Sequence, residues 1–126
     1  MRKYSILVSG HTISIDNDLI NDLKRYSIIV LTNKENKYIE YIITNRKVDL
    51  IIIEIVINDY NSEIEIIKQV KARFPDILII LIDGDGDRDI IARAFASGID
   101  DFFRKPYRYS LISERVNALL RNMYSN

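Results

Sequence analysis

The sequence predicts an α/β domain in which a doubly wound, five-stranded parallel sheet of order 2-1-3-4-5 carries helices on both faces. Five short runs rich in β-branched residues alternate with five amphipathic segments, the pattern of a parallel sheet with crossover helices. Three of the runs are almost continuously apolar, as strands buried on both faces are. The 126 residues suffice for one such domain, and no linker or repeat divides residues 1–126.

The predicted strands are short, and the third has the most uniform apolar character. It begins with the run Asp49-Leu50-Ile51-Ile52-Ile53-Glu54, which places a carboxylate within an otherwise apolar strand. The five strands are predicted at residues 4–9, 27–32, 49–56, 77–82 and 100–104.

The segments between the strands carry apolar residues at helical spacing. Pro75 stops the third helix, and Gly98 is predicted to cap the fourth. The residues that mark the five helices are, in chain order, Leu19, Ile20 and Leu23; Ile39, Ile42 and Ile43; Ile66, Ile67, Val70 and Phe74; Ile90, Ile91, Ala94 and Phe95; and Leu111, Ile112, Val116, Leu119 and Leu120.

The composition excludes several classes of protein. Basic and acidic residues balance at 18 each, so no overall field attracts nucleic acid or an anionic membrane. The absence of cysteine excludes disulfides and thiolate metal sites. No apolar run approaches the ~20 residues of a membrane span, and the N-terminal apolar stretch is too short for a signal peptide. We expect a soluble, cytoplasmic domain.

Sites in doubly wound sheets lie beyond the C-terminal ends of the strands. That rule selects residues 9–12, 54–60, 82–87 and 105–106. An ionised carboxylate buried at such a place costs several kcal/mol unless a cation or hydrogen-bond donors meet it. Lys105 follows the fifth strand, from which its side chain can reach across the crevice. We therefore expect Glu54 and Lys105 to form an ion pair, with a structural or a functional role.

The chain as a whole resembles a response-regulator receiver domain, the phosphoryl-accepting module of bacterial two-component signalling. The resemblance covers roughly residues 3–122 and rests on the strand order and on three segments: residues 49–54, Ala96-Ser97-Gly98-Ile99-Asp100-Asp101-Phe102, and Lys105-Pro106. It implies the flavodoxin-like architecture and a cis Lys105-Pro106 peptide bond.

The resemblance assigns family roles to four positions of the chain. The phosphoacceptor aspartate of the family falls on Glu54, and the family's lysine and following proline are retained as Lys105 and Pro106. The aromatic switch residue of the fifth strand falls on Phe102.

Other family positions depart from the pattern. The magnesium-binding acidic pair falls on Gly10 and His11, and the hydroxyl residue that ends the fourth strand falls on Ile82. Magnesium prefers carboxylate oxygens, and phosphoryl transfer needs fixed donors for the developing charge. Glu54 also sets its carboxylate one methylene further out than aspartate. The resemblance thus implies a receiver without its metal, cofactor or phosphorylation chemistry, and not an enzyme; a conventional receiver with a modified site is the alternative.

Two further features are read as structural. His11, the only histidine, is interpreted as a loop residue, with a pH-sensitive hydrogen bond to Glu54 as the alternative. The acidic segment from Asp83 to Asp89 is interpreted as a solvated turn that caps the fourth helix. The alternative there, a calcium loop, would require an acidic residue at position 94, which is alanine.

A different class of function is suggested by the turn after the first strand. Residues 9–14, Ser-Gly-His-Thr-Ile-Ser, are rich in hydroxyl groups and lead into a helix. Such turns bind phosphates through backbone N–H groups. The alternative hypothesis is therefore a flavodoxin-like domain that binds flavin or another small phosphate-bearing molecule.

The residues that follow Phe102 predict a surface for protein partners. Receivers commonly signal through helix 4, strand 5 and helix 5, and tyrosine and arginine are enriched at interface hot spots. We expect an output domain, another protein or a second copy of the chain to bind there, and no direct binding of nucleic acid by this domain. The predicted surface comprises Phe103, Arg104, Tyr107, Arg108 and Tyr109.

Overall fold

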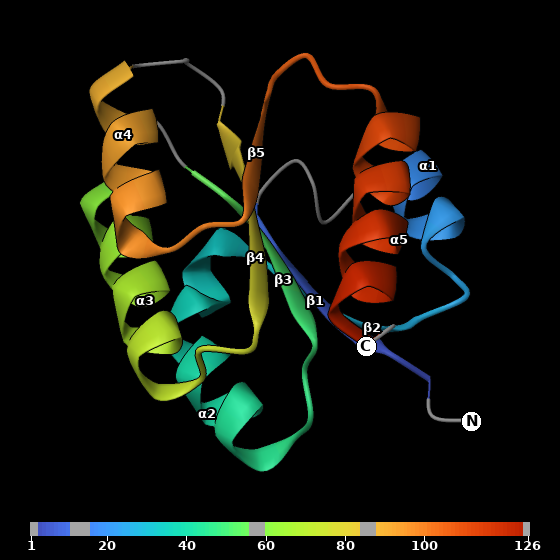
Figure 1. Cartoon of the computed structure of the whole chain (residues 1–126), viewed down its shortest axis with the longest axis horizontal. Helices are drawn as coiled ribbons and strands as arrows, with labels where there is room; N and C mark the ends of the chain where they lie inside the picture. Colours follow the sequence, from blue (N-terminus) through green and yellow to red (C-terminus); the bar gives the residue numbers. More distant parts are fainter. Residues whose placement is uncertain (1–2, 11–15, 56–59, 84–87, 125–126) are drawn as a thin grey trace.

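In the computed structural model of the chain, five parallel strands form one sheet in the order β2-β1-β3-β4-β5 (Figure 1). The structure describes residues 3–10, 16–55, 60–83 and 88–124. The strands are β1 (Ser5–Ser9), β2 (Ser27–Leu31), β3 (Leu50–Glu54), β4 (Leu78–Asp83) and β5 (Asp101–Arg104). The predicted fold class and strand order are confirmed, and each strand lies within a residue or two of its predicted bounds.

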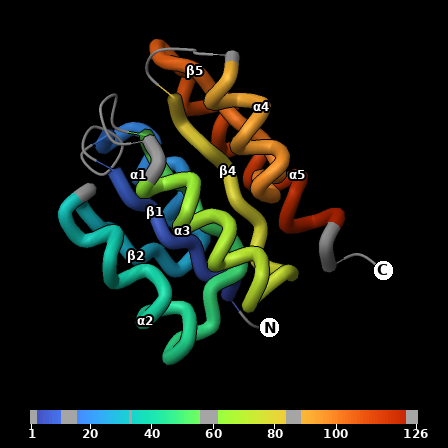
Figure 2. Tube along the Cα trace, turned by 90° about the vertical axis from the view of Figure 1, so that its left-hand side faces the viewer, coloured from blue at the N-terminus to red at the C-terminus, as the bar shows by residue number. Residues whose placement is uncertain are grey.

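Helices cover both faces of the sheet. They are α1 (Asn17–Asp22), α2 (Ile39–Asn45), α3 (Tyr60–Arg73), α4 (Arg88–Ser97) and α5 (Tyr109–Tyr124). Figure 1 shows α1 and α5 on one side of the sheet, and Figure 2 shows α2, α3 and α4 side by side on the other.

The strands divide their side chains between two apolar cores. In β3, Ile51 and Ile53 pack toward α2, α3 and α4, whereas Leu50 and Ile52 pack toward α1 and α5. This alternation follows from the two-residue period of a strand. It explains why β3 is apolar throughout, since neither of its faces reaches water.

A short 3-10 helix, η2 (Asn33–Tyr38), precedes α2 and was not predicted. Thr32 and Glu35 form a capping box at its start, in which the Glu35 carboxylate accepts the backbone N–H of Thr32 at 2.8 Å. The Thr-x-x-Glu spacing is visible in the sequence. The apolar periodicity that marked the other helices is absent from η2, so the segment resembled a loop.

Gly98 ends α4 as predicted, with φ +114°. A Cβ built at this residue would lie 2.7 Å from the Cγ of Lys71. The Lys71 stem crosses this point because its ammonium group binds the Ile77 carbonyl at 2.6 Å and the Asp100 carboxylate at 3.0 Å. Position 98 therefore needs glycine for its backbone angle and for its lack of a side chain.

Candidate functional site

The C-terminal ends of β1, β3, β4 and β5 meet at one edge of the sheet (Figure 1). Ser9, Glu54 and Asp83 end the first three of these strands, and all three side chains are buried. Lys105 follows the fourth. Parallel strands thus bring together polar groups that lie far apart in the sequence, as predicted for a doubly wound sheet.

Glu54 and Lys105 form the predicted ion pair. The Glu54 side chain is 2% exposed and that of Lys105 is 30% exposed. The carboxylate has therefore lost nearly all of its water, while the ammonium group remains partly hydrated. The backbone of Lys105 is anchored to β4, because its N–H donates to the Asp83 carbonyl at 2.9 Å. The Lys105-Pro106 peptide bond is cis, as the resemblance implied.

The end of β4 differs from the prediction by one residue. The strand was expected to end at Ile82, but it continues to Asp83. Ile82 pairs in register with Glu54, and its side chain is part of the core beneath α1 and α5. The last side chain of the strand is consequently the carboxylate of Asp83, which is 1% exposed.

A chain of buried polar groups adjoins the end of β1. The Ser9 hydroxyl donates to the Asn36 side-chain carbonyl, and the Asn36 amide donates to the Glu63 carboxylate at 3.4 Å. These residues come from β1, η2 and α3, and all are buried. Sequence reasoning gave no role to Asn36 or Glu63, because it did not predict η2, which brings Asn36 beneath the strand end.

Two predictions concern the residues that follow Ser9. Gly10 continues from β1 and donates its N–H to the Leu31 carbonyl at 3.2 Å. His11 and most of the predicted phosphate-binding turn lie outside the described residues. Within the described part of that turn, the Ser9 hydroxyl already binds Asn36 and is not directed at a ligand.

Tyr107, a residue of the predicted partner surface, is half-buried at the same edge of the sheet. Its hydroxyl donates to the Asp16 carboxylate at 2.7 Å. The other oxygen of Asp16 caps α1 by accepting the N–H of Leu19 at 3.1 Å. Burial raises the pKa of the Tyr107 hydroxyl well above its ordinary value, and the hydrogen bond to Asp16 and the negative charges of Asp16 and Glu54 raise the pKa further.

The two phenylalanines of β5 point to opposite cores. Phe102 packs against the core under α3 and α4 and meets Phe95 edge to face, with ring centroids 5.8 Å apart. Phe103 packs against the core under α1 and α5. Both are half-buried, whereas Arg104 and Arg108 are exposed.

The described residues do not fit the magnesium site of a receiver. Gly10 has no side chain that could bind a metal ion. The Ser9 hydroxyl binds Asn36, and the Glu54 carboxylate is paired with Lys105. Within the described ranges, no group of three or more histidine, cysteine or acidic side chains is placed to hold a metal. Of the four aspartates of the predicted acidic turn, only Asp83 and Asp89 fall in those ranges.

No helix in the described part of the chain combines the length and the apolar character that crossing a membrane requires.

A family model described as the response regulator receiver domain matches residues 13–117. The chain is 27% identical over 108 residues to a cyclic di-GMP phosphodiesterase of Thermotoga maritima and covers 28% of that protein. It is 21% identical over 108 residues to the transcriptional regulatory protein CitT of Halalkalibacterium halodurans and covers 46% of it. These matches extend over 82% and 85% of the chain, which spans less than half the length of either relative.

Among solved structures, the chain is similar to the signal receiver domain of an HD domain-containing protein from Pseudomonas fluorescens Pf-5. The two have a TM-score of 0.83 and 21% sequence identity, and the match covers 99% of this chain and 100% of that one. This likeness establishes the shared fold.

Removing the cation of the ion pair should destabilise the domain more than removing the charge of the carboxylate. We expect Lys105→Met to destabilise the domain by about 3–5 kcal/mol, because it leaves the Glu54 carboxylate buried without a cation. Glu54→Gln should cost only about 1–2 kcal/mol, since Lys105 can recover water. Urea unfolding measures both values. Arg115→Gln, which breaks the more exposed pair with Asp101 at side-chain exposures of 42% and 30%, is the control and should cost about 1 kcal/mol or less. An equal or larger cost for Glu54→Gln would contradict this account.

The raised pKa of Tyr107 predicts a dependence of stability on alkaline pH. The unfolded chain releases this proton near pH 10, whereas the folded protein retains it. The stabilisation is complete below about pH 10 and is lost as the pH rises from there toward the folded-state pKa. Tyr107→Phe should flatten this loss, as measured by urea unfolding at a series of pH values. Tyr41→Phe is the matched control because its ring is 70% exposed; if both variants behave alike, Tyr107 is not the group responsible.

Proposed function

Because the chain belongs to the response regulator receiver domain family of two-component signalling, we propose that it is a receiver that signals through protein contacts without being phosphorylated. The observation that carries the proposal is the ion pair between Glu54 and Lys105 at the C-terminal edge of the sheet. Glu54 stands at the family's phosphoacceptor position, and Lys105 is the family's lysine.

Glu54 supplies a fixed negative charge where a receiver would gain one. Its side chain is one methylene longer than aspartate, which moves the carboxylate by about 1.5 Å toward the position of a phosphoryl group. One charge replaces the about −1.5 to −2 of a phosphoryl group. Lys105 is already bound to this charge, so the site is held in one electrostatic state.

We use the ends of β1 and β4 to propose which residues stand at the family's acidic-pair and hydroxyl positions. We assign the hydroxyl position to Asp83, which ends β4, and not to Ile82, whose side chain is in the core. Register pairs Ser9 with Ile53, the residue before Glu54. On this basis we assign the acidic pair to Ser9 and Gly10, one residue earlier than the sequence indicated. A carboxylate at position 83 cannot donate a hydrogen bond to a phosphoryl oxygen while it is ionised.

The proposed function is that of a signalling module and not of an enzyme. The relative named as a phosphodiesterase is much longer than this chain, which matches 28% of it. Its enzymatic name therefore applies to that protein and does not extend to residues 1–126. Among the described residues at this edge of the sheet, Glu54 is paired with Lys105 and Ser9 is bonded to Asn36, so neither is activated as a nucleophile.

We place the partner surface on α4, β5 and α5. Phe95, Tyr109 and Leu111 are exposed there at 46%, 42% and 46%, and Arg104 and Arg108 are exposed between them. Aromatic residues and arginine are enriched in interface cores. A second copy of the chain or an output domain is the proposed occupant. The Tyr107 hydroxyl binds Asp16, so we propose no partner contact through that hydroxyl.

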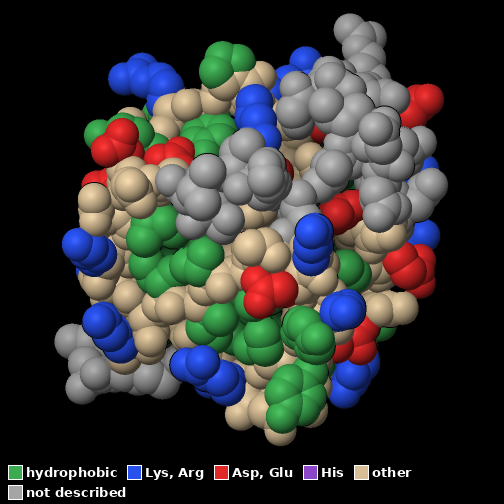
Figure 3. Space-filling view, turned by 180° about the vertical axis from the view of Figure 1, so that it is seen from behind, with side chains coloured by type: hydrophobic (Ala, Val, Ile, Leu, Met, Phe, Trp, Pro, Cys, Tyr) green, Lys and Arg blue, Asp and Glu red, His purple; other side chains and the backbone are tan. Residues whose placement is uncertain are grey.

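Direct binding of nucleic acid is not part of the proposal. The chain carries equal numbers of basic and acidic residues. Among the described residues on the face drawn in Figure 3, lysine and arginine side chains are interspersed with acidic and hydrophobic ones and form no continuous stripe. A clustered basic surface is the usual footprint of a nucleic-acid partner.

A phosphoryl mimic tests whether the site can switch. We expect magnesium and beryllium fluoride to leave the amide NMR signals of Glu54, Asp83 and Lys105 unchanged, because the carboxylate is paired and the metal ligands are missing. Acetyl phosphate should likewise add no phosphoryl group, as measured by intact mass. Shifts that spread from these residues into α4 would overturn the proposal.

A restored variant provides the positive control for the same experiment. Ser9→Asp, Gly10→Asp, Glu54→Asp and Asp83→Thr together rebuild the residue types that the family uses. This variant should show magnesium-dependent NMR shifts with beryllium fluoride if the replaced residues are the reason why the natural chain shows none. If the folded variant remained silent, the loss of these residues would not explain the behaviour of the natural sequence.

The partner surface predicts concentration-dependent self-association. Leu111→Glu places a charge within the exposed apolar group on α5, so it should shift the dimer toward monomer by about tenfold or more in dissociation constant. Sedimentation velocity over a concentration series measures the effect. Tyr41→Glu, on α2, is the control and should have no effect. A natural chain that remains monomeric at all concentrations would eliminate the homodimer and leave the output domain as occupant.

A further inference from the structure

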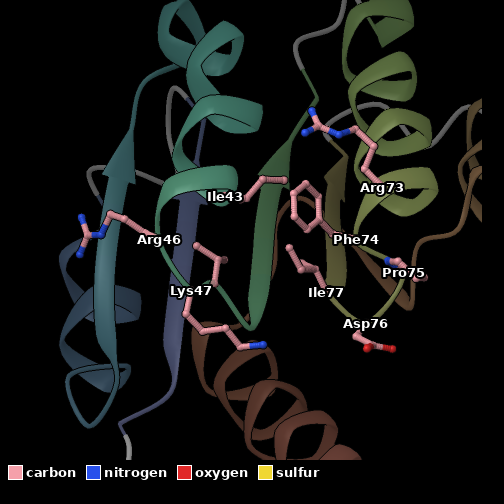
Figure 4. Close-up of a pocket in the computed structure, with 9 residues that line it drawn as sticks. Ile43, Arg46, Lys47, Arg73, Phe74, Pro75, Asp76 and Ile77 are labelled. Carbon is pink, nitrogen blue, oxygen red and sulfur yellow. The ribbon is translucent and has the colours of Figure 1, made fainter.

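A second candidate site lies at the opposite edge of the sheet from Glu54. A cavity of about 340 Å³ is formed where α2 and α3 end and where β4 begins (Figure 4). Ligand cavities commonly have volumes of about 300–1,000 Å³. The cavity therefore has room for a small organic molecule, and none of its lining residues takes part in the proposed receiver function.

The floor of the cavity is apolar. Figure 4 shows the side chains of Ile43, Phe74 and Ile77 turned toward one another across it. Ile43 and Ile77 are buried, and Val48 is buried beside them. Phe74 is half-buried and packs against the same core. These side chains provide an apolar surface for an aliphatic or aromatic group, which would gain by leaving water.

Two cations lie at different ends of this floor in Figure 4. Arg73 is fixed in place, because it binds the Glu40 carboxylate at 3.0 Å and lies over the Phe74 ring at 5.2 Å. Lys47 is exposed, and within the described ranges its ammonium group makes no ion pair. The Arg46 guanidinium and the Asp76 carboxylate point away from the cavity.

We propose that this cavity binds a small organic anion, a compact apolar or aromatic body that carries a carboxylate, phosphate or sulfonate group. The apolar body occupies the floor between Ile43, Phe74 and Ile77, and the anionic group pairs with Lys47. Arg73 stacks on Phe74 and closes the other end of the cavity. This assignment is independent of the proposed receiver function.

The positions of the cations favour Lys47 as the group that meets the ligand. Arg73 lies in the last turn of α3, where a cation also offsets the negative end of the helix dipole, and it is already paired. Lys47 lies beyond Arg46, the C-cap of α2, and outside the last turn of that helix. The helix dipole therefore does not account for Lys47, and its charge is available to an anion.

Anilinonaphthalene sulfonate is a suitable probe, because it joins an aromatic body to one anionic group. We expect it to shift the amide NMR signals of Ile43, Val48, Phe74 and Ile77 with saturating behaviour. The Lys47→Gln variant should weaken binding by about threefold to fivefold, the range of an exposed ion pair. Raising the salt concentration should weaken binding to the natural chain more than to the variant.

Three controls test whether the anionic group of the probe pairs with Lys47. Lys24→Gln removes an exposed lysine elsewhere and should leave the affinity unchanged. The uncharged analogue N-phenylnaphthylamine should bind the natural chain about threefold to fivefold more weakly than the sulfonate, and inorganic phosphate alone should give no shifts. Shifts confined to α4, β5 and α5, equal affinities for Lys47→Gln and the natural chain, or equal binding of phosphate alone would each overturn the proposal.

Discussion

The Glu54 carboxylate has lost nearly all of its water, and the edge of this sheet is organised around the cation that meets it. Glu54 is held in a strand with apolar neighbours on both faces, so it cannot turn toward solvent without disrupting β3. Lys105 must therefore approach from the end of β5. The hydrogen bond from its backbone N–H to the Asp83 carbonyl fixes the chain at the point from which it does so.

The surrounding contacts extend this arrangement to both faces of the sheet. On one face, Ser9, Asn36 and Glu63 connect β1 to η2 and α3 through buried hydrogen bonds. On the other, Tyr107 binds Asp16 and thereby connects the chain after β5 to the start of α1. Buried polar groups of this kind are costly when separated from their partners. Movement of any one element at this edge would expose a polar group of a neighbouring element or leave it buried without its hydrogen-bond partner.

The sequence predicted the parts of the structure that follow from periodicity. The apolar run of β3 and the helical spacing on α5 identify elements whose side chains repeat with a regular period. The ion pair followed from topology, because a parallel sheet brings the ends of β3 and β5 to one edge. The exact end of β4 did not follow, because an acidic residue after an apolar run reads equally well as the last strand residue or the first loop residue. Asp83 was therefore assigned to a turn.

Contacts that follow from neither periodicity nor strand order could not be predicted. Asn36 lies in η2, a segment with no apolar repeat, and its hydrogen bonds to Ser9 and Glu63 join residues 27 positions away on either side. Composition assigned Tyr107 to a partner surface and gave no sign of its hydrogen bond to Asp16. Its bond to Asp16 depends on the path of the chain beyond Pro106, which no local pattern encodes.

The close contact between Gly98, which follows α4, and Lys71 of α3 limits how this sequence can diverge. Any side chain at position 98 would meet the Lys71 stem, and that stem carries the ammonium group that binds Asp100 and the Ile77 carbonyl. A larger residue at 98 would strain the backbone at φ +114° and would also displace this stem from Asp100. We therefore expect glycine to be retained at position 98 in relatives of this chain that carry the Lys71 and Asp100 pair.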